Sequence, residues 1–189
     1  MTKAELRKIY KERRSQLSAE QRRGLSAKIC ANVIAAFGFE HGSCVHVFMP
    51  IEFQREVDTL LLIKHFWENG VRVFVPKVVP DDIESVEITP DTQFIKNKWG
   101  IPEPEISSPS VINHFDYVFT PLLYCDSAGN RVGYGKGFYD RFFSRINADV
   151  VKVGLNFFQP KESIEDVFSD DIPLDYLVTP RDVLSFGRA

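Results

Sequence analysis

Residues 44–76 read CVHVFMPIEFQREVDTLLLIKHFWENGVRVFVP, and this stretch decides the class of fold. It opens with an apolar run that ends at Pro50 and closes with a second apolar run, residues 71–75. Between the two runs lie a loop and then a helical segment, residues 58–68, which an Asn-Gly pair terminates. Short apolar strands that are separated by a helix predict a mostly parallel sheet with helices on both faces.

The rest of the chain extends this pattern in both directions. We expect further strands at residues 85–89, 116–121, 150–155 and 175–179, and helices at 3–17, 18–36 and 138–146. The second of these helices begins with a capping box, Ser18-Ala-Glu-Gln21. Residues 90–114, which are rich in Pro and Ser, and residues 124–137 are expected to be mostly loop. No repeat or linker divides the sequence, which therefore predicts a single α/β domain over residues 1–189.

Composition and charge limit the classes of function. A net charge of −3 argues against a general attraction for nucleic acid. Three cysteines without paired spacing indicate reduced thiols rather than a disulfide framework or a zinc site. The charged amino-terminal segment has no apolar signal core, and no apolar run is long enough to span a bilayer. We therefore expect a cytoplasmic monomer that acts on small molecules, with no nucleic-acid or membrane partner.

A glycine loop, Gly133-Tyr-Gly-Lys-Gly137, stands directly before the helix that is expected to start at Phe138. Its glycines let backbone amides approach an anion, and the helix start behind them adds further N–H donors. Lys136 and the nearby Arg131 supply positive charge. The spacing is neither that of a Walker A motif nor that of a dinucleotide-binding fingerprint. A phosphate site and a flexible turn that carries a solvated lysine therefore both stay open from the spacing alone.

The longer string around this loop is Asp126-Ser-Ala-Gly-Asn-Arg-Val-Gly-Tyr-Gly-Lys-Gly-Phe-Tyr-Asp-Arg141. It resembles the signature D-x-x-G-x-R-L-G-x-G-x-G-Y-Y-D of the 5-formyltetrahydrofolate cyclo-ligase family. Three further segments agree with the family in order: Lys3-Ala-Glu-Leu-Arg7, Glu56-Val-Asp-Thr59 and Trp99-Gly-Ile-Pro-Glu-Pro104. The resemblance covers nearly the whole chain and implies a Rossmann-like fold, similar to that of phosphosugar isomerases and CoA transferases. The chain departs from the signature at Phe138, where the family has Tyr, and at Val132, where it has Leu.

The resemblance implies a single catalytic domain with an ATP-dependent reaction and Mg²⁺ as cofactor. In that reaction 5-formyltetrahydrofolate closes to 5,10-methenyltetrahydrofolate, and ADP and phosphate are released. The formyl oxygen first attacks the γ-phosphate to give an iminophosphate, and N10 then attacks the activated carbon. Two alternatives are a nucleotide-binding module and an ATP-independent isomerase or transferase on the same fold. The basic residues Lys3, Arg7 and Lys136 argue against the second alternative, and binding without turnover would identify the first.

The resemblance also implies the residues of the site. The expected catalytic residues are Lys136, Arg131 and Glu56, the last of which would orient the formyl group and N10. The residues expected to bind ATP are Lys3, Arg7, Arg131, Gly133, Tyr134, Gly135, Lys136, Gly137, Phe138 and Tyr139. Those expected to bind the folate are Glu56, Trp99, Tyr139, Phe48 and Ile51, with Glu52 as a minor rival of Glu56. The expected metal ligands are Asp140 and Asp175, and Asp170 and Asp171 are close rivals for the second position.

From the residues alone, plainer readings stay open for several of these positions. Lys3 and Arg7 lie one helical turn apart, so a solvated basic face accounts for them as well. Glu56 fits an acid near a helix start, and the aromatic residues fit ordinary core positions.

Overall fold

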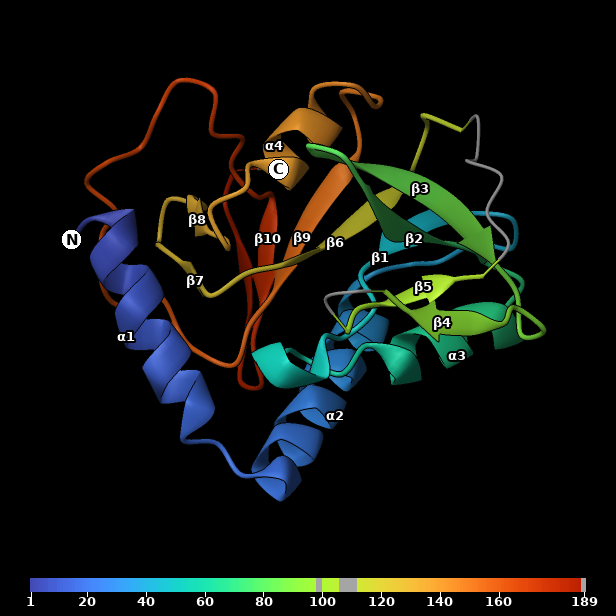
Figure 1. The fold of residues 1–189 in the computed structure, drawn as a ribbon, viewed down its shortest axis with the longest axis horizontal. Coiled ribbons are helices and arrows are strands. Elements are labelled where there is room, and N and C mark those ends of the chain that lie inside the picture. Colours follow the sequence, from blue (N-terminus) through green and yellow to red (C-terminus); the bar gives the residue numbers. More distant parts are fainter. Residues whose placement is uncertain (98–99, 106–111, 188–189) are drawn as a thin grey trace.

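The computed structural model describes residues 1–97, 100–105 and 112–187 and confirms a mostly parallel α/β fold. Its centre is a seven-stranded sheet (Figure 1). In spatial order the strands are β11 (Val183–Ser185), β10 (Tyr176–Val178), β9 (Val151–Leu155), β6 (Tyr117–Pro121), β1 (Cys44–Val47), β2 (Arg72–Val79) and β3 (Asp82–Ile88). The five inner strands pair in parallel, and the two edge strands are antiparallel to their neighbours. Parallel neighbours need a crossover connection, and helical segments supply it between β1 and β2 and between β6 and β9.

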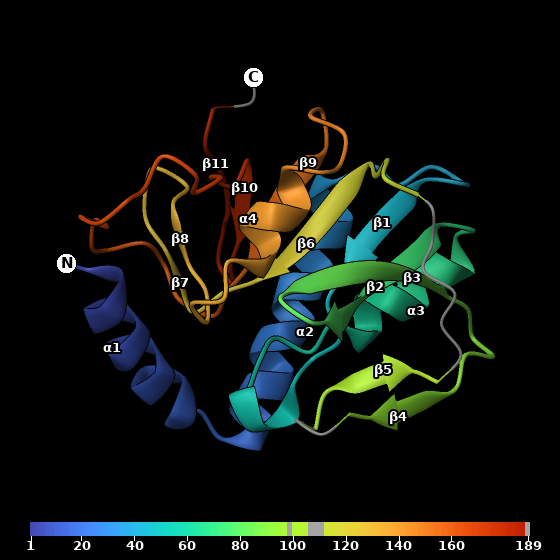
Figure 2. The same cartoon turned by 45° about the horizontal axis from the view of Figure 1, so that its top comes forward.

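Helices cover both faces of the sheet, as the sequence predicts. They are α1 (Lys3–Ser15), α2 (Ala19–Ala36), α3 (Leu60–Glu68) and α4 (Phe138–Phe143). The predicted capping box at the start of α2 is present, with the Ser18 hydroxyl accepting from the Gln21 amide at 3.1 Å. Helices α2 and α3 lie on one face of the sheet and α4 on the other, while α1 stands apart at one side (Figure 2).

Alternate side chains of β1 show how the two faces are filled. Val45 and Val47 are fully buried in the core that includes α2 and α3. His46 points to the opposite face, where its ring lies 4.6 Å from that of Phe142 on α4. Because both faces are covered, nearly every position of the inner strands is apolar, which is the pattern that the sequence showed.

Helix α1 packs on a small hairpin rather than on the main sheet. The hairpin consists of β7 (Tyr124–Cys125) and β8 (Arg131–Val132), and it lies just ahead of the glycine loop. Leu6 and Tyr10 of α1 are fully buried against it, and the rings of Tyr10 and Tyr124 stack at 4.3 Å. Leu6 and Tyr10 therefore anchor α1 in a position that brings Arg7 against the glycine loop.

The structure corrects the sequence-based prediction in the short elements. The segments expected to be mostly loop contain two hairpins, β7–β8 and the pair β4 (Phe94–Lys96) and β5 (Pro102–Pro104). Strand β11 has no counterpart in the prediction, and α4 ends three residues earlier than expected, at Phe143. Strands of two or three residues are too short to show a periodic pattern, which explains the omissions.

Membrane-spanning segments and cysteine pairing are the two remaining features that the sequence addresses. No helix in the described part of the chain is both long enough and apolar enough to cross a membrane. The three cysteines, Cys30, Cys44 and Cys125, are free thiols.

Candidate active site

A cavity of about 600 Å³ opens at the carboxyl ends of the parallel strands. Phe48 and Met49 follow directly after β1, Pro121 ends β6, and Pro76 and Val78 belong to β2. Ligands of open α/β sheets bind at this edge, because the loops after the strands converge there. Further parts of the wall come from α1, the glycine loop, the start of α4 and the segment that follows β1.

The glycine loop has a defined shape, held by α1. Gly135 and Gly137 have φ angles of +87° and +65°, a backbone conformation that side chains with a Cβ rarely adopt. A Cβ on Gly135 would lie 3.5 Å from the guanidinium of Arg7. The Arg7 Nε donates a hydrogen bond of 2.9 Å to the carbonyl of Gly133. These contacts hold the loop in one shape, whereas the spacing alone also allowed a flexible turn.

Four cationic side chains line this part of the cavity. Lys3 and Arg7 come from α1, Arg131 from β8, and Lys136 from the loop itself. Lys3 and Arg131 pair with carboxylates, whereas Lys136 is exposed and has no ion-pair partner among the described residues. Phosphoryl transfer depends mainly on positioned positive charge, and this group of cations can supply it.

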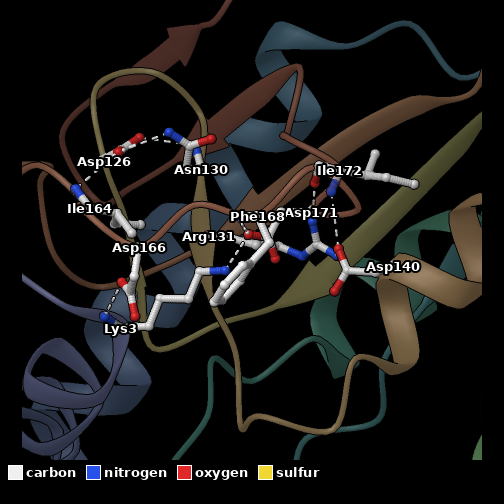
Figure 3. Close-up of polar contacts among 10 residues, drawn as sticks. All are labelled: Lys3, Asp126, Asn130, Arg131, Asp140, Ile164, Asp166, Phe168, Asp171 and Ile172. Carbon is white, nitrogen blue, oxygen red and sulfur yellow. Dashed lines mark hydrogen bonds and ion pairs between the residues drawn. The ribbon is translucent and has the colours of Figure 1, made fainter.

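The Arg131 guanidinium joins α4 to the chain segment that precedes β10. It pairs with Asp140 Oδ1 at 2.6 Å and donates a second hydrogen bond to the carbonyl of Ile172 (Figure 3). The Ile172 amide donates to the same Asp140 oxygen at 3.1 Å. Asp140 Oδ2 has no partner among the described residues and points away from these contacts (Figure 3). One carboxylate oxygen of Asp140 is thus available to a ligand in the cavity.

The Lys3 ammonium forms an ion pair with Asp171 (Figure 3). Asp171 also accepts a hydrogen bond of 2.6 Å from the amide of Phe168, and the Phe168 ring lies 5.0 Å from the Lys3 ammonium. Burial alone would raise the pKa of Asp171, but the hydrogen bonds from Lys3 and Phe168 outweigh it and lower that pKa. Both members of the pair line the cavity.

Asp175, the second metal ligand expected from the sequence, lies elsewhere. It is not among the residues that line the cavity, and its carboxylate pairs with Lys152 of β9 at 3.0 Å. It also accepts a hydrogen bond of 2.7 Å from the Lys152 amide, next to the start of β10. Asp175 thus joins neighbouring strands, and the rival Asp171 is the carboxylate that the fold brings to the cavity. Asp170 does not line it either.

The cavity offers suitable donors for a magnesium ion. Asp140 and Asp171 are hard oxygen ligands, and the residue next to Asp171, Ile172, donates to Asp140. The described residues contain no cluster of three or more His, Cys, Asp or Glu side chains that could hold a metal alone. Two carboxylates fit Mg²⁺, which usually keeps waters and completes its shell with substrate phosphates.

Glu56 is buried in another part of the cavity wall, where the loop residue Tyr134 contacts it, and this part is called the Glu56 end. The Glu56 side chain is 6 % exposed and accepts hydrogen bonds from the Tyr134 hydroxyl at 2.6 Å and the Ile51 amide at 2.8 Å. Burial raises the pKa of Glu56, although Tyr134, Ile51 and Arg14 act in the opposite direction. Its rival Glu52 is exposed in a short 3₁₀ turn, Glu52–Gln54, and does not line the cavity.

Apolar and aromatic side chains surround the Glu56 end. Phe48, Ile51, Phe138 and Tyr139 all line the cavity, as expected from the sequence. The Tyr139 hydroxyl is buried without a hydrogen-bond partner among the described residues, and burial raises its pKa. Trp99, the remaining expected folate residue, lies outside the described residues.

Further lining residues escaped the sequence reasoning. They are Met49, Phe53, Gln54, Pro76, Val78, Ile83, Ile101 and Pro121. Most of them lie in or just after strands, where an apolar residue reads as core, and no local signal marks them. Ile101 is the exception, since it belongs to the Trp99–Pro104 segment that carries part of the family resemblance.

Comparisons with known proteins agree over the length of the chain. The model of the 5-formyltetrahydrofolate cyclo-ligase family matches residues 1–180. The 5-formyltetrahydrofolate cyclo-ligase of Haemophilus influenzae is 30% identical over 185 residues, which cover 93% of this chain and 95% of that protein. The solution structure of Aquifex aeolicus 5,10-methenyltetrahydrofolate synthetase superposes with a TM-score of 0.81 at 32% identity, covering 100% of this chain and 96% of that one. The synthetase of Mycoplasma pneumoniae, at 24% identity and a TM-score of 0.74, shares the fold.

Proposed function

Because the chain belongs to the 5-formyltetrahydrofolate cyclo-ligase family, we propose that it catalyses the ATP-dependent cyclisation of 5-formyltetrahydrofolate to 5,10-methenyltetrahydrofolate. The observation that carries this proposal is the division of one cavity into two chemically different ends. One end holds the glycine loop and the cations Lys3, Arg7, Arg131 and Lys136. The other end holds the buried carboxylate of Glu56 among apolar and aromatic side chains.

The cationic end fits the triphosphate of ATP. Loop amides and the side chains of Arg7 and Lys136 would bind the phosphates and orient the γ-phosphoryl group toward the Glu56 end. Asp140 and Asp171 would hold Mg²⁺, which would supply further positive charge to the phosphates. A phosphate that enters would compete with these carboxylates for Arg131 and Lys3, since both cations already carry a partner.

The apolar end fits the flat pterin of a reduced folate. Tyr139 and Phe48 would flank the ring, and the Glu56 carboxylate would accept hydrogen bonds from its N–H groups. A buried carboxylate held by two donors is a rigid acceptor, because neither oxygen can turn without losing a hydrogen bond. It would therefore fix the formyl group and N10 relative to the γ-phosphate.

The reaction itself needs no nucleophile from the protein. The formyl oxygen attacks the γ-phosphorus, the bond to the bridging oxygen breaks, and ADP leaves. N10 then attacks the formyl carbon, the oxygen departs with the phosphoryl group as phosphate, and the N10 proton is lost. Positive charge from Lys136 and Arg131 would stabilise the transferring group, and the enclosing apolar walls would exclude competing water.

The proposal extends to the setting of the enzyme. The free thiols support a reducing, cytoplasmic compartment, because disulfides rather than free thiols prevail in oxidising ones. The substrates would be ATP and a folate, both small molecules, and the active form would be a monomer, since one chain supplies both ends of the cavity.

A spectroscopic assay tests this function directly. Purified protein is mixed with ATP, Mg²⁺ and 5-formyltetrahydrofolate, and the near-ultraviolet absorbance of the methenyl product is followed. We expect ATP-dependent product and a loss of about 100-fold or more in kcat for Lys136→Ala, the effect of removing one preorganised charge from a transition state.

The matched control is Lys64→Ala, which removes an exposed lysine on α3 that pairs with Glu68 and does not line the cavity. It should leave the rate unchanged. Folded protein that binds ATP yet forms no product would refute the cyclo-ligase proposal and favour a nucleotide-binding module.

A further inference from the structure

A buried arginine outside the cavity contacts both the glycine loop and the segment that precedes Glu56. Arg14, near the end of α1, is 3 % exposed, although an arginine is almost never fully buried without partners. It lies two turns of helix beyond Arg7, on the same side of α1, because seven residues make nearly two full turns. Arg14 does not line the cavity itself, so it cannot act as a further ligand for phosphate.

Arg14 contacts three separate segments of the chain that build the site. Its guanidinium donates to the carbonyl of Leu122 after β6 and to the carbonyl of Gln54 at 3.4 Å. It also donates to the Tyr134 hydroxyl in the glycine loop at 3.0 Å. These contacts fix the position of Tyr134 relative to the segment that carries Glu56.

Tyr134 completes the chain of hydrogen bonds. Its hydroxyl accepts from Arg14 and donates to Glu56 Oε1 at 2.6 Å, so a single oxygen joins the cation to the carboxylate. Because a hydroxyl has one proton, the bond from Arg14 leaves that proton free for Glu56 alone. Tyr134 also stands between two loop glycines, Gly133 and Gly135, so its backbone is part of the glycine loop.

We propose that Arg14 and Tyr134 are positioning residues for Glu56, and that they couple the nucleotide loop to the folate end of the cavity. In this arrangement the Tyr134 hydroxyl reaches Glu56 only when the loop is in the shape that holds the phosphates. ATP would then favour the conformation of Glu56 that binds the folate, and the folate would favour the loop conformation that binds ATP. The inference rests on the proposed function, of which it specifies how the two substrates are bound together.

The charged and titratable groups that face Glu56 come from three elements. They are Tyr134 in the loop, Arg14 on α1 and Tyr139 on α4. Tyr134 and Arg14 both favour the ionised carboxylate, so removing either one should raise the pKa of Glu56. Tyr139 makes no hydrogen bond to Glu56 and should not compensate for the loss.

The test uses two variants and two matched controls. Tyr134→Phe removes only the hydroxyl, and Arg14→Met removes the cation while keeping most of the side-chain volume. The control Tyr10→Phe removes another tyrosine hydroxyl that donates to a glutamate, Glu162, at 2.6 Å outside the cavity. The control Arg13→Met removes the neighbouring arginine of α1, which is exposed.

In the active enzyme, we expect kcat/KM for the folate to fall about tenfold in Tyr134→Phe and in Arg14→Met, the effect of one lost hydrogen bond to a charged group. The acid limb of its pH profile should move to higher pH in both variants. The double variant should lose little more than either single one, because both changes break the same chain of hydrogen bonds. In the wild type, folate should raise the affinity for a non-hydrolysable ATP analogue, and the analogue should raise the affinity for folate. Both variants should lose this mutual effect. Tyr10→Phe and Arg13→Met should match the wild type in kcat/KM, in the pH profile and in the mutual enhancement of binding.

A second measurement does not depend on activity. Carbon-13 NMR of the glutamate carboxyl groups, with the Glu56 signal identified in Glu56→Gln, gives the pKa of Glu56 in each variant. We expect that pKa to rise in Tyr134→Phe and to stay constant in Tyr10→Phe.

The two proposals fail in different ways. An inactive wild type would refute the proposed function. The NMR titration of Glu56 would then still test whether Arg14 and Tyr134 control its pKa. An active wild type with unchanged profile, substrate coupling and Glu56 pKa in Tyr134→Phe would overturn the coupling and leave the function standing. If Arg14→Met does not fold, Tyr134→Phe alone gives the answer, since its ring keeps the packing.

Discussion

The two ends of the cavity hold their carboxylates in opposite ways. Asp171 and Asp140 lie at the accessible end, each paired with a cation, and their side chains are 25% and 29% exposed. Glu56 lies at the buried end, where a neutral hydroxyl and a backbone amide hold it. Asp171 consequently has a lowered pKa and Glu56 a raised one.

The difference separates exchangeable from fixed interactions. An ion pair can exchange one charged partner for another, so an incoming phosphate could take the place of a carboxylate on Lys3 or Arg131 while the charge of the cation stays compensated. A buried carboxylate that loses its donors keeps the full desolvation cost, so its hydrogen bonds persist through binding. The charged end is therefore suited to taking up and releasing a nucleotide, and the buried end to orienting a substrate.

The substitution that disturbs the buried end most is Glu56→Gln. We expect kcat/KM for the folate to fall about 100-fold, because the charge that we propose to orient the pterin is lost while the side-chain volume stays the same. Titration with ATP alone should show a much smaller loss, because Glu56 contacts the glycine loop only through the Tyr134 hydroxyl among the hydrogen bonds of the described residues. A loss of ATP affinity as large as the loss in kcat/KM, in protein of native thermal stability, would contradict the separation of the two ends.

At the accessible end, Asp171→Asn should change the preference between two forms of the nucleotide. We expect weaker binding of MgATP by about tenfold and tighter binding of metal-free ATP, since the variant loses the proposed metal ligand and a charge that repels phosphate. Calorimetric titration with and without magnesium measures both effects. Asp175→Asn is the matched control, because it breaks an ion pair outside the cavity. It should lower the unfolding temperature and leave both affinities unchanged, and an effect of Asp175→Asn equal to that of Asp171→Asn would refute the metal assignment.

The smallest expected effect is on the pH dependence of stability. The pKa of Glu56 in the folded protein lies above its ordinary value of 4.5, so the folded state retains this proton longer than the unfolded state. The stability of the wild type relative to Glu56→Gln should therefore decline as the pH rises from 4.5 through the folded pKa. For Asp171 the sign is opposite, because its lowered pKa gives stability that is present above 3.8 and is lost as the pH falls. Urea unfolding of the wild type, Glu56→Gln and Asp171→Asn across this pH range measures how the stability difference from the wild type changes with pH. A change of the same sign for both variants would show that the two carboxylates are held alike.

The sequence predicted the inner strands, the longer helices and the position of the glycine loop, because each carries a local signal. Apolar runs such as residues 71–75 mark buried strands, and the Ser18 capping box marks the start of α2. The edge strand β11 and the hairpin β4–β5 carry no such signal, since short strands are specified by the neighbours that they pair with.

The candidate site was predictable only where residues belong to a recognisable string. Lys3, Arg7, Glu56 and the loop residues matched such strings, and the fold brings them to one cavity. The family resemblance favours Asp175 over Asp171 as a metal ligand. Which of these two aspartates, four residues apart, faces the cavity depends on the path of the chain before β10. Arg14 could not be distinguished from the other arginines of α1, because its role depends on Tyr134 and Gln54, far away in the sequence.

The arrangement of α1 has a consequence for how this chain can change over time. Lys3, Arg7 and Arg14 all belong to one uninterrupted helix, whose two ends contact different parts of the site. Inserting or deleting one residue between Arg7 and Arg14 would rotate one end against the other by about 100° and shift it by about 1.5 Å. Substitutions on the outer face of α1 leave this geometry intact, whereas a change in its length does not. Evolution of this sequence can therefore change residues on the outer face of α1, but it must keep the number of residues between Arg7 and Arg14.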